Sequence, residues 1–211
     1  MTVVFLAQMV PGKTGNALHE LLGIVFVALF LIHHVLNRGW LRRLGRGRTL
    51  RARLTVVSDV VLMLAMLGTI ASGVLMSRSA APALSVPAVA HVVRPLHGTC
   101  AYLSLMAMSL HVGLHMRVLR GYVGLRGPSR SGKVAPLVVL AASFALGTWA
   151  FVRLGVLAKL LGETSFPDGM TPLALQLAYH LALAAPFVVL GSLVASHRTS
   201  DTSLADGREE R

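Results

Sequence analysis

The 211-residue chain is 55% hydrophobic and only 13% charged, and its mean hydropathy is +0.69. Ordinary soluble domains carry about 25% charged residues, so this composition excludes a water-soluble globule. The formal net charge of +12 would indicate a nucleic-acid partner in a soluble protein. Here the Lys and Arg residues lie between apolar runs, so membrane topology explains the charge and we expect no nucleic-acid partner.

The first residues do not resemble a cleaved signal peptide. They lack a charged leading region, and their short apolar stretch ends at Pro11-Gly12. We therefore expect residues 1–16 to be an extracytoplasmic N-terminal segment, with the first span acting as its own insertion signal.

Five apolar segments follow in chain order. Each is long enough to cross about 30 Å of hydrocarbon as a helix. They cover residues 17–36, 54–76, 96–116, 134–157 and 171–196. The sequence thus predicts an all-α integral membrane protein in which residues 17–196 form one five-helix bundle. The polar tail, 197–211, has no apolar face to bury, so we expect it to be disordered and cytoplasmic.

The basic residues fall mainly on one side of the predicted membrane. Fifteen of the twenty Lys and Arg residues lie in the 37–53 loop, the 117–133 loop and the tail. Cytoplasmic loops are enriched in these residues. This bias predicts an odd number of spans, with the N-terminus outside and the C-terminus in the cytoplasm.

Four of the nine histidines form two pairs with equal spacing. His19 and His33 are 14 residues apart in the first span, and His97 and His111 are 14 apart in the third. Fourteen residues are just under four helical turns, so each pair lies on one helix face, about 21 Å apart along the axis. A polar side chain in hydrocarbon is costly and tends to mark a cofactor, an ion path or a helix contact.

The first and third spans run in the same direction in this topology. His19 and His97 therefore share the outer level, and His33 and His111 share the inner one. Neutral imidazole is a good axial ligand for haem iron, and two facing helices can clamp one macrocycle. We expect two b-type haems, held non-covalently because the chain has no Cys-X-X-Cys-His motif.

At the inner level, the sequence leaves two candidate ligands on each helix. His34 follows His33 directly, and His115 lies one turn beyond His111. Each is an alternative axial ligand or a partner for a haem propionate, and face geometry favours His33 and His111. For histidines near span ends, such as His19, helix contacts or interfacial positions are the competing interpretation.

Five further residues are candidates for cofactor binding. Gly23, Gly98 and Gly113 lie near the histidine levels and would let a flat macrocycle approach the backbone, although glycine also promotes helix packing in lipid. Arg78 and Arg94 on the outer side would meet haem propionates, although arginines also reach lipid headgroups.

Two other polar residues have competing interpretations. We expect Asp59, near the inner start of the second span, to pair with nearby arginines, and a proton relay is the alternative. His180 lies midway along the fifth span, where hydrogen bonding to a neighbouring helix is expected and a quinone-binding role is the minority option.

Four stretches carry recognisable motifs. They are 19–23 (HELLG), 33–40 (HHVLNRGW), 72–78 (SGVLMSR) and 109–115 (SLHVGLH). Together with His97 and Tyr102 they resemble the small bacterial haem-b membrane proteins catalogued as a domain of unknown function. That family is grouped with the cytochrome b561 and formate dehydrogenase gamma-subunit type of di-haem cytochrome. The resemblance covers about 17–116, and the later spans match less well.

The resemblance implies a location in the bacterial cytoplasmic (inner) membrane and a role in electron transfer. It implies exchange between a quinol or a cytoplasmic-side donor and an extracytoplasmic redox protein, often a flavin-carrying one. The implied axial ligands are His19, His33 or His34, His97, and His111 or His115. We therefore expect a cytochrome subunit rather than a stand-alone enzyme. The alternatives are a histidine-using metal transporter and a haem-free membrane anchor of a redox complex.

Overall fold

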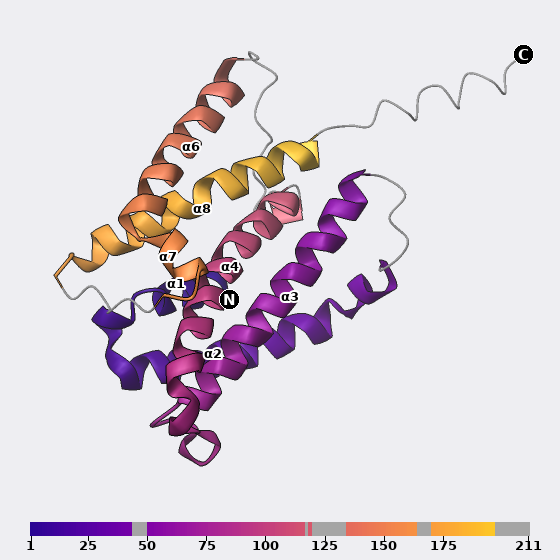
Figure 1. The fold of residues 1–211 in the computed structure, drawn as a ribbon. Helices are drawn as coiled ribbons and strands as arrows, with labels where there is room; N and C mark the ends of the chain where they lie inside the picture. Colours follow the sequence, from indigo (N-terminus) through magenta and orange to yellow (C-terminus); the bar gives the residue numbers. More distant parts are fainter. Residues whose placement is uncertain (44–49, 117, 120–133, 164–169, 197–211) are drawn as a thin grey trace, which may run out of the picture.

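Helices and turns make up the part of the chain that the computed structural model describes, which is residues 1–43, 50–116, 118–119, 134–163 and 170–196. These residues contain no strand, as the all-α prediction requires. The five apolar segments form five long helices (Figure 1), and the predicted tail, 197–211, lies outside the described residues. The long helices are α2 (Pro11–Leu36), α3 (Leu50–Met76), α4 (Ala90–Leu114), α6 (Val134–Arg153) and α8 (Leu173–Ser196). The short ones are α1 (Thr2–Gln8), α7 (Val156–Leu160) and the 3-10 turns Arg38–Arg43, Pro82–Leu84 and Pro87–Val89.

Three of the described helices are long and apolar enough to cross a membrane. They are Pro11–Leu36, Ala52–Met76 and Leu173–Ser196, and Leu137–Arg153 is a shorter apolar helix. Large apolar side chains on these helices face outward, as Leu64 does with 64% of its surface exposed. An apolar outer surface of this kind suits lipid rather than water. The chain therefore has the build of an all-helical membrane protein.

Glycine with positive φ marks two changes of chain direction. Gly15 has a φ of 71° and interrupts the beginning of α2, which starts at Pro11. Gly155 is left-handed, with a φ of 58°, and separates α6 from α7. L-residues with a side chain rarely adopt these angles, so both bends depend on glycine.

Close packing joins four of the five long helices, α3, α4, α6 and α8. Helix α3 packs along α4, α4 packs along α8, and α6 packs along α8. At the α4–α8 contact, a Cβ added to Gly113 would lie only 2.3 Å from the carbonyl oxygen of Val188, and one added to Gly191 would lie 2.5 Å from that of Leu110. Only glycine allows these two backbones to touch, as is usual for tightly packed membrane helices.

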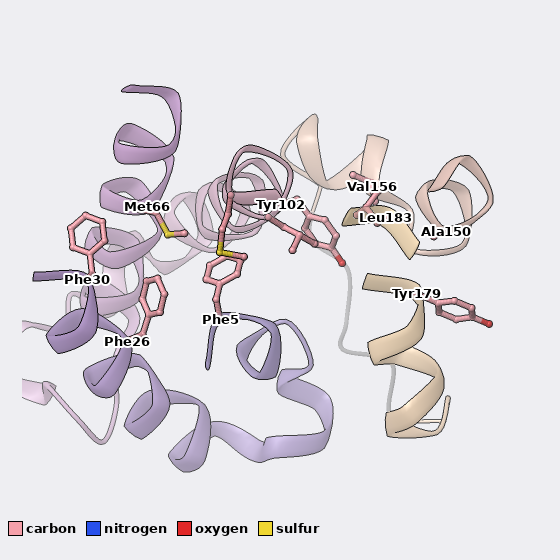
Figure 2. Close-up of a cluster of buried hydrophobic side chains, with 11 residues drawn as sticks. Phe5, Phe26, Phe30, Met66, Tyr102, Ala150, Val156, Tyr179 and Leu183 are labelled. Atoms are coloured by element: carbon pink, nitrogen blue, oxygen red, sulfur yellow. The ribbon is translucent and has the colours of Figure 1, made fainter. Parts of the chain in front are cut away.

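The N-terminal helix α1 packs into the bundle. Its Phe5 is only 2% exposed, and its ring centroid lies 5.4 Å from that of Phe26 on α2. Figure 2 shows Phe5 in the middle of the buried cluster, which also contains Met66 of α3 and Leu105 of α4. The predicted N-terminal segment, 1–16, contains helix α1 and the beginning of α2, and its Phe5 and Val10 are buried against the core.

Helix α2 packs mainly against the short helix α1. It contacts α3 sparsely and does not pack along α4. This loose arrangement leaves room between α2 and α4, where the four paired histidines lie.

Candidate functional site

The histidine pair that the sequence assigns to the outer level, called the outer pair from here on, comes together between α2 and α4, and the other pair is called the inner pair. The ring centroids of His19 and His97 lie 6.3 Å apart, and the ring planes make an angle of 75°. Both side chains are part-buried. The pairing predicted for the outer level is therefore present as a geometric contact.

The inner pair repeats the outer geometry. The ring centroids of His33 and His111 lie 6.5 Å apart, again with an interplanar angle of 75°. The equal spacing of the two pairs in the sequence thus becomes two equivalent contacts between the same two helices, as expected for positions 14 residues apart on straight helices.

Helix α3 holds the ring of His97 on one side. Nδ1 of His97 donates a hydrogen bond to the carbonyl oxygen of Thr69 at 3.0 Å, and the hydroxyl of Ser72 lies 3.0 Å from the same nitrogen. A Cβ at Gly73 would lie 3.3 Å from Cε1 of His97, so glycine lets the ring approach α3. Because a carbonyl oxygen only accepts, the proton is on Nδ1 and Nε2 carries a free lone pair.

The inner histidine has a charged partner in the corresponding place. Nδ1 of His111 donates to Oδ1 of Asp59 at 2.8 Å. A carboxylate oxygen accepts this hydrogen bond, and in a neutral imidazole that donates from Nδ1 the acceptor is Nε2. The bond gives Asp59 a partner on α4, whereas the sequence led us to expect arginine partners. Asp59 stands on the α3 face that packs against α4, and this places its carboxylate beside the ring.

Each histidine pair borders its own cavity. The inner cavity has a volume of about 390 Å³ and the outer one about 400 Å³. Both are lined by α1, α2, α3 and α4, with mainly apolar side chains around the imidazoles. Met1 and Thr2 line the inner cavity, and Phe5 and Gln8 line the outer one, so α1 borders both.

Four histidines surround the inner cavity. Beside His33 and His111, it is lined by His34 and His115. The ring of His34 packs against Phe30 with centroids 4.3 Å apart, and its buried Nδ1 has no hydrogen-bond partner among the described residues. His115 lies beside His111, with centroids 4.5 Å apart. The two alternative ligands are therefore present in the same cavity, while the described ring contact across it joins His33 to His111.

The carboxylate of Glu20 fastens the outer end of α2 to the segment that follows α3. It accepts hydrogen bonds from the Ser77 hydroxyl at 2.8 Å and from the backbone N–H groups of residues 78, 79 and 80 at 3.0, 2.8 and 2.7 Å. Glu20 follows His19 directly, so this clasp fixes the helix end that presents the outer ligand. The side chains of Arg78 and Arg94 are exposed near this end, and the structure describes no contact between them and the histidines.

The candidate glycines have different surroundings. Gly23 lines the outer cavity, and a Cβ there would lie 3.4 Å from Nε2 of Gln8. A Cβ at Gly98 would meet nothing within 4 Å. Gly113 contacts the backbone of α8 and lines neither cavity, because its face of α4 is turned toward α8. The helix packing given as the alternative role of Gly113 is therefore present, and its role in macrocycle approach stays a prediction.

His180 belongs to a separate buried polar cluster. It is 3% exposed, its Nδ1 donates to the carbonyl oxygen of Gln176 at 2.7 Å, and its Nε2 lies 3.4 Å from the Tyr102 hydroxyl of α4. The ammonium of Lys159 on α7 lies 5.1 Å from the centre of the Tyr102 ring, and burial lowers the pKa of Lys159. The helix contact expected for His180 is present, and this residue lines neither cavity.

Asp59, Gly73 and α1 were not identified as site residues from the sequence. Asp59 lies inside an apolar segment, which is a signal for a functional polar group. Gly73 lies within the SGVLMSR motif. No sequence signal assigns a cavity-lining role to the short apolar stretch that becomes α1.

Compared with protein-family models, with curated proteins and with solved structures, the chain gives no match.

Proposed function

We propose that this chain is a membrane cytochrome that carries electrons across the bilayer through two bis-histidine b-type haems. The observation that supports this most directly is the duplicated histidine pair, in which His19 faces His97 and His33 faces His111 at nearly the same ring spacing. A helix contact made by histidine has no reason to recur with the same spacing and geometry at two levels.

The ring spacing fits one iron between each pair. Metal–imidazole bonds are about 2 Å long, so two imidazoles on opposite sides of one iron have ring centres roughly 6 Å apart. The described separations are 6.3 Å and 6.5 Å. No large rearrangement of α2 or α4 is needed to reach that distance.

The cavities also fit a large, mostly apolar group. Pockets for small molecules and cofactors have volumes of about 300–1,000 Å³, and these two measure about 390 and 400 Å³. In the outer cavity, the buried Nδ1 of His19 has no hydrogen-bond partner among the described residues. A buried polar atom without a partner is costly in a protein that binds nothing there.

The residues of the chain have distinct parts in this proposal. Bound haem supplies a one-electron centre at each level. His19 with His97, and His33 with His111, would hold the haems through ring nitrogens, and the groups on Nδ1 of the α4 histidines hold those rings in the tautomer that frees Nε2. Apolar side chains of α1, α2 and α3 line both cavities and would lower the local dielectric constant around a bound haem.

The topology that goes with this function has five spans. Fifteen of the twenty Lys and Arg residues lie in segments at one set of helix termini. These are the C-termini of α2, α4 and α8, at residues 36, 114 and 196, and the N-termini of α3 and α6, at residues 50 and 134. The positive-inside rule then puts His33 and His111 nearer the cytoplasm and the N-terminus outside. The bacterial cytoplasmic membrane is the proposed location.

The proposed partners come from the family resemblance. A quinol or a cytoplasmic-side reductant is the donor, and an extracytoplasmic redox protein, of the flavin-carrying kind, is the acceptor. The chain then works as the cytochrome subunit of an oxidoreductase system.

A second candidate function is direct binding of a divalent transition metal at the inner level. One donor atom each from Asp59, His111 and His115 lies within 4.8 Å of the others. Two imidazoles and one carboxylate are a donor set used by zinc and iron sites. This set accounts for one level only, whereas the haem proposal accounts for both pairs.

Two single variants separate the candidates. His33→Ala removes an axial ligand but leaves the Asp59–His111–His115 set intact, so we expect it to halve the haem content of the purified protein. His115→Ala disrupts the cation set and should leave two haems per chain. His91→Ala is the matched control, because His91 is an exposed residue at the start of α4. The proposal would be overturned if the protein purified without haem but with bound zinc, nickel or copper. In that case His115→Ala would lose the metal, whereas His33→Ala and His91→Ala would keep it.

A further inference from the structure

The two α4 histidines differ in the group that receives their Nδ1 proton. His97 donates to a neutral backbone carbonyl, that of Thr69, at 3.0 Å. His111 donates to a carboxylate, that of Asp59, at 2.8 Å. The two sites are alike in ring spacing and cavity size, so this difference is a chemical distinction between the α4 ligands of the two levels.

A carboxylate acceptor changes an imidazole ligand in two ways. It fixes the ring orientation and tautomer, and it increases the basicity of the other ring nitrogen. Hydrogen bonds with an ionised partner are about twice as strong as neutral ones. A more basic axial ligand and a nearby negative charge both stabilise the oxidised form of an iron centre.

At the outer site, no carboxylate takes the place that Asp59 has beside His111. Glu20 borders the outer cavity, but its described hydrogen bonds run to Asn16, to Ser77 and to the backbone that follows α3. None of them reaches His19 or His97. The outer imidazoles therefore have no carboxylate hydrogen-bonded to a ring nitrogen among the described residues, although the charge of Glu20 lies close to His19.

Resting on the function proposed above, we infer that Asp59 is the positioning residue of the inner site. It selects His111 over His115 as the α4 ligand, and it gives the inner haem a lower reduction potential than the outer one. The outer site is then the better electron acceptor of the two, which matches delivery to an extracytoplasmic partner.

The test is a redox titration of the full-length protein, followed by its visible absorbance. Asp59→Asn keeps an oxygen acceptor but removes the charge, so one of the two midpoint potentials should shift upward while the other stays in place. Asp59→Glu should restore a low potential. Ser72→Ala is the matched control at the outer level, because it removes a neutral group 3.0 Å from Nδ1 of His97 and should move neither potential comparably.

Assignment to the inner level uses the His97→Ala background, in which the single remaining haem should be the one that shifts. Its low-spin electron paramagnetic resonance signal should change with Asp59→Asn, because that signal responds to the basicity of the axial imidazole. If Asp59→Asn loses the inner haem, return of haem at the wild-type potential in Asp59→Glu supports the inference.

Two haems per chain with unshifted potentials in Asp59→Asn would overturn the inference but leave the proposed function standing. Absence of haem from the wild-type protein would instead overturn the proposed function.

Discussion

The imidazole of His97 lies against Gly73, where an added Cβ would sit 3.3 Å from Cε1 of the ring. This approach lets Nδ1 reach the carbonyl of Thr69, so the ring is held against α3. The position of the outer ligand therefore depends on a missing side chain on the neighbouring helix.

Gly73→Val should displace the ring of His97 and weaken haem binding at the outer level. A branched side chain adds atoms beyond the Cβ that is already in tight contact, and small-to-large changes at packed positions cost about 1–3 kcal/mol. The matched control is Ala71→Val, because Ala71 is exposed on the same helix. The measurement is haem content per chain, and equal content in both variants would contradict the packing argument.

Removing one α4 ligand at a time should empty one level at a time. His97→Ala should lose the outer haem and keep the inner one, and His111→Ala should do the reverse. The two sites lie about 21 Å apart along α4, so little coupling is expected between them. Haem content should fall by half in each variant and remain unchanged in His91→Ala. Unchanged haem content in both ligand variants would show that the assignment is wrong.

Phe5→Ala should loosen α1 from the bundle. The Phe5 side chain is 2% exposed, and truncating a buried phenylalanine costs about 3–5 kcal/mol. Val3, with 79% of its surface exposed on the same helix, gives the control variant Val3→Ala. Hydrogen exchange of residues 2–8 measures the opening, and protection equal to that of the control would contradict the packing of α1.

Gly113→Val should destabilise the α4–α8 contact. The Cβ alone would lie 2.3 Å from a backbone oxygen of α8, so the helices must separate. We expect a lower thermal unfolding temperature than for Ala71→Val, which adds the same side chain at an exposed position. A variant as stable as the control would mean that α4 and α8 do not pack through this glycine.

The features that could be predicted from the sequence are those that helix geometry alone determines. The five apolar segments are long enough to define five helices, and the 14-residue spacing places His19 with His97 and His33 with His111 once α2 and α4 run parallel. These relationships depend on helical periodicity and chain direction, which the sequence contains directly.

Other features depend on the rotation of one helix against another, which periodicity does not determine. Whether Asp59 meets arginines or His111, and whether Gly113 faces a cavity or α8, follows from how α3, α4 and α8 pack. The short apolar stretch 2–8 fits an extracytoplasmic segment and a packed helix equally well, and its burial becomes visible only in the assembled bundle.

The most direct test of the central proposal is the dithionite-reduced minus oxidised absorbance spectrum of the detergent-purified protein, with a pyridine haemochrome assay for haem per chain. We predict sharp bands of low-spin b-type haem and two haems per chain. Absence of haem after expression with ample haem supply would contradict the proposal and favour the metal-binding or anchor alternatives.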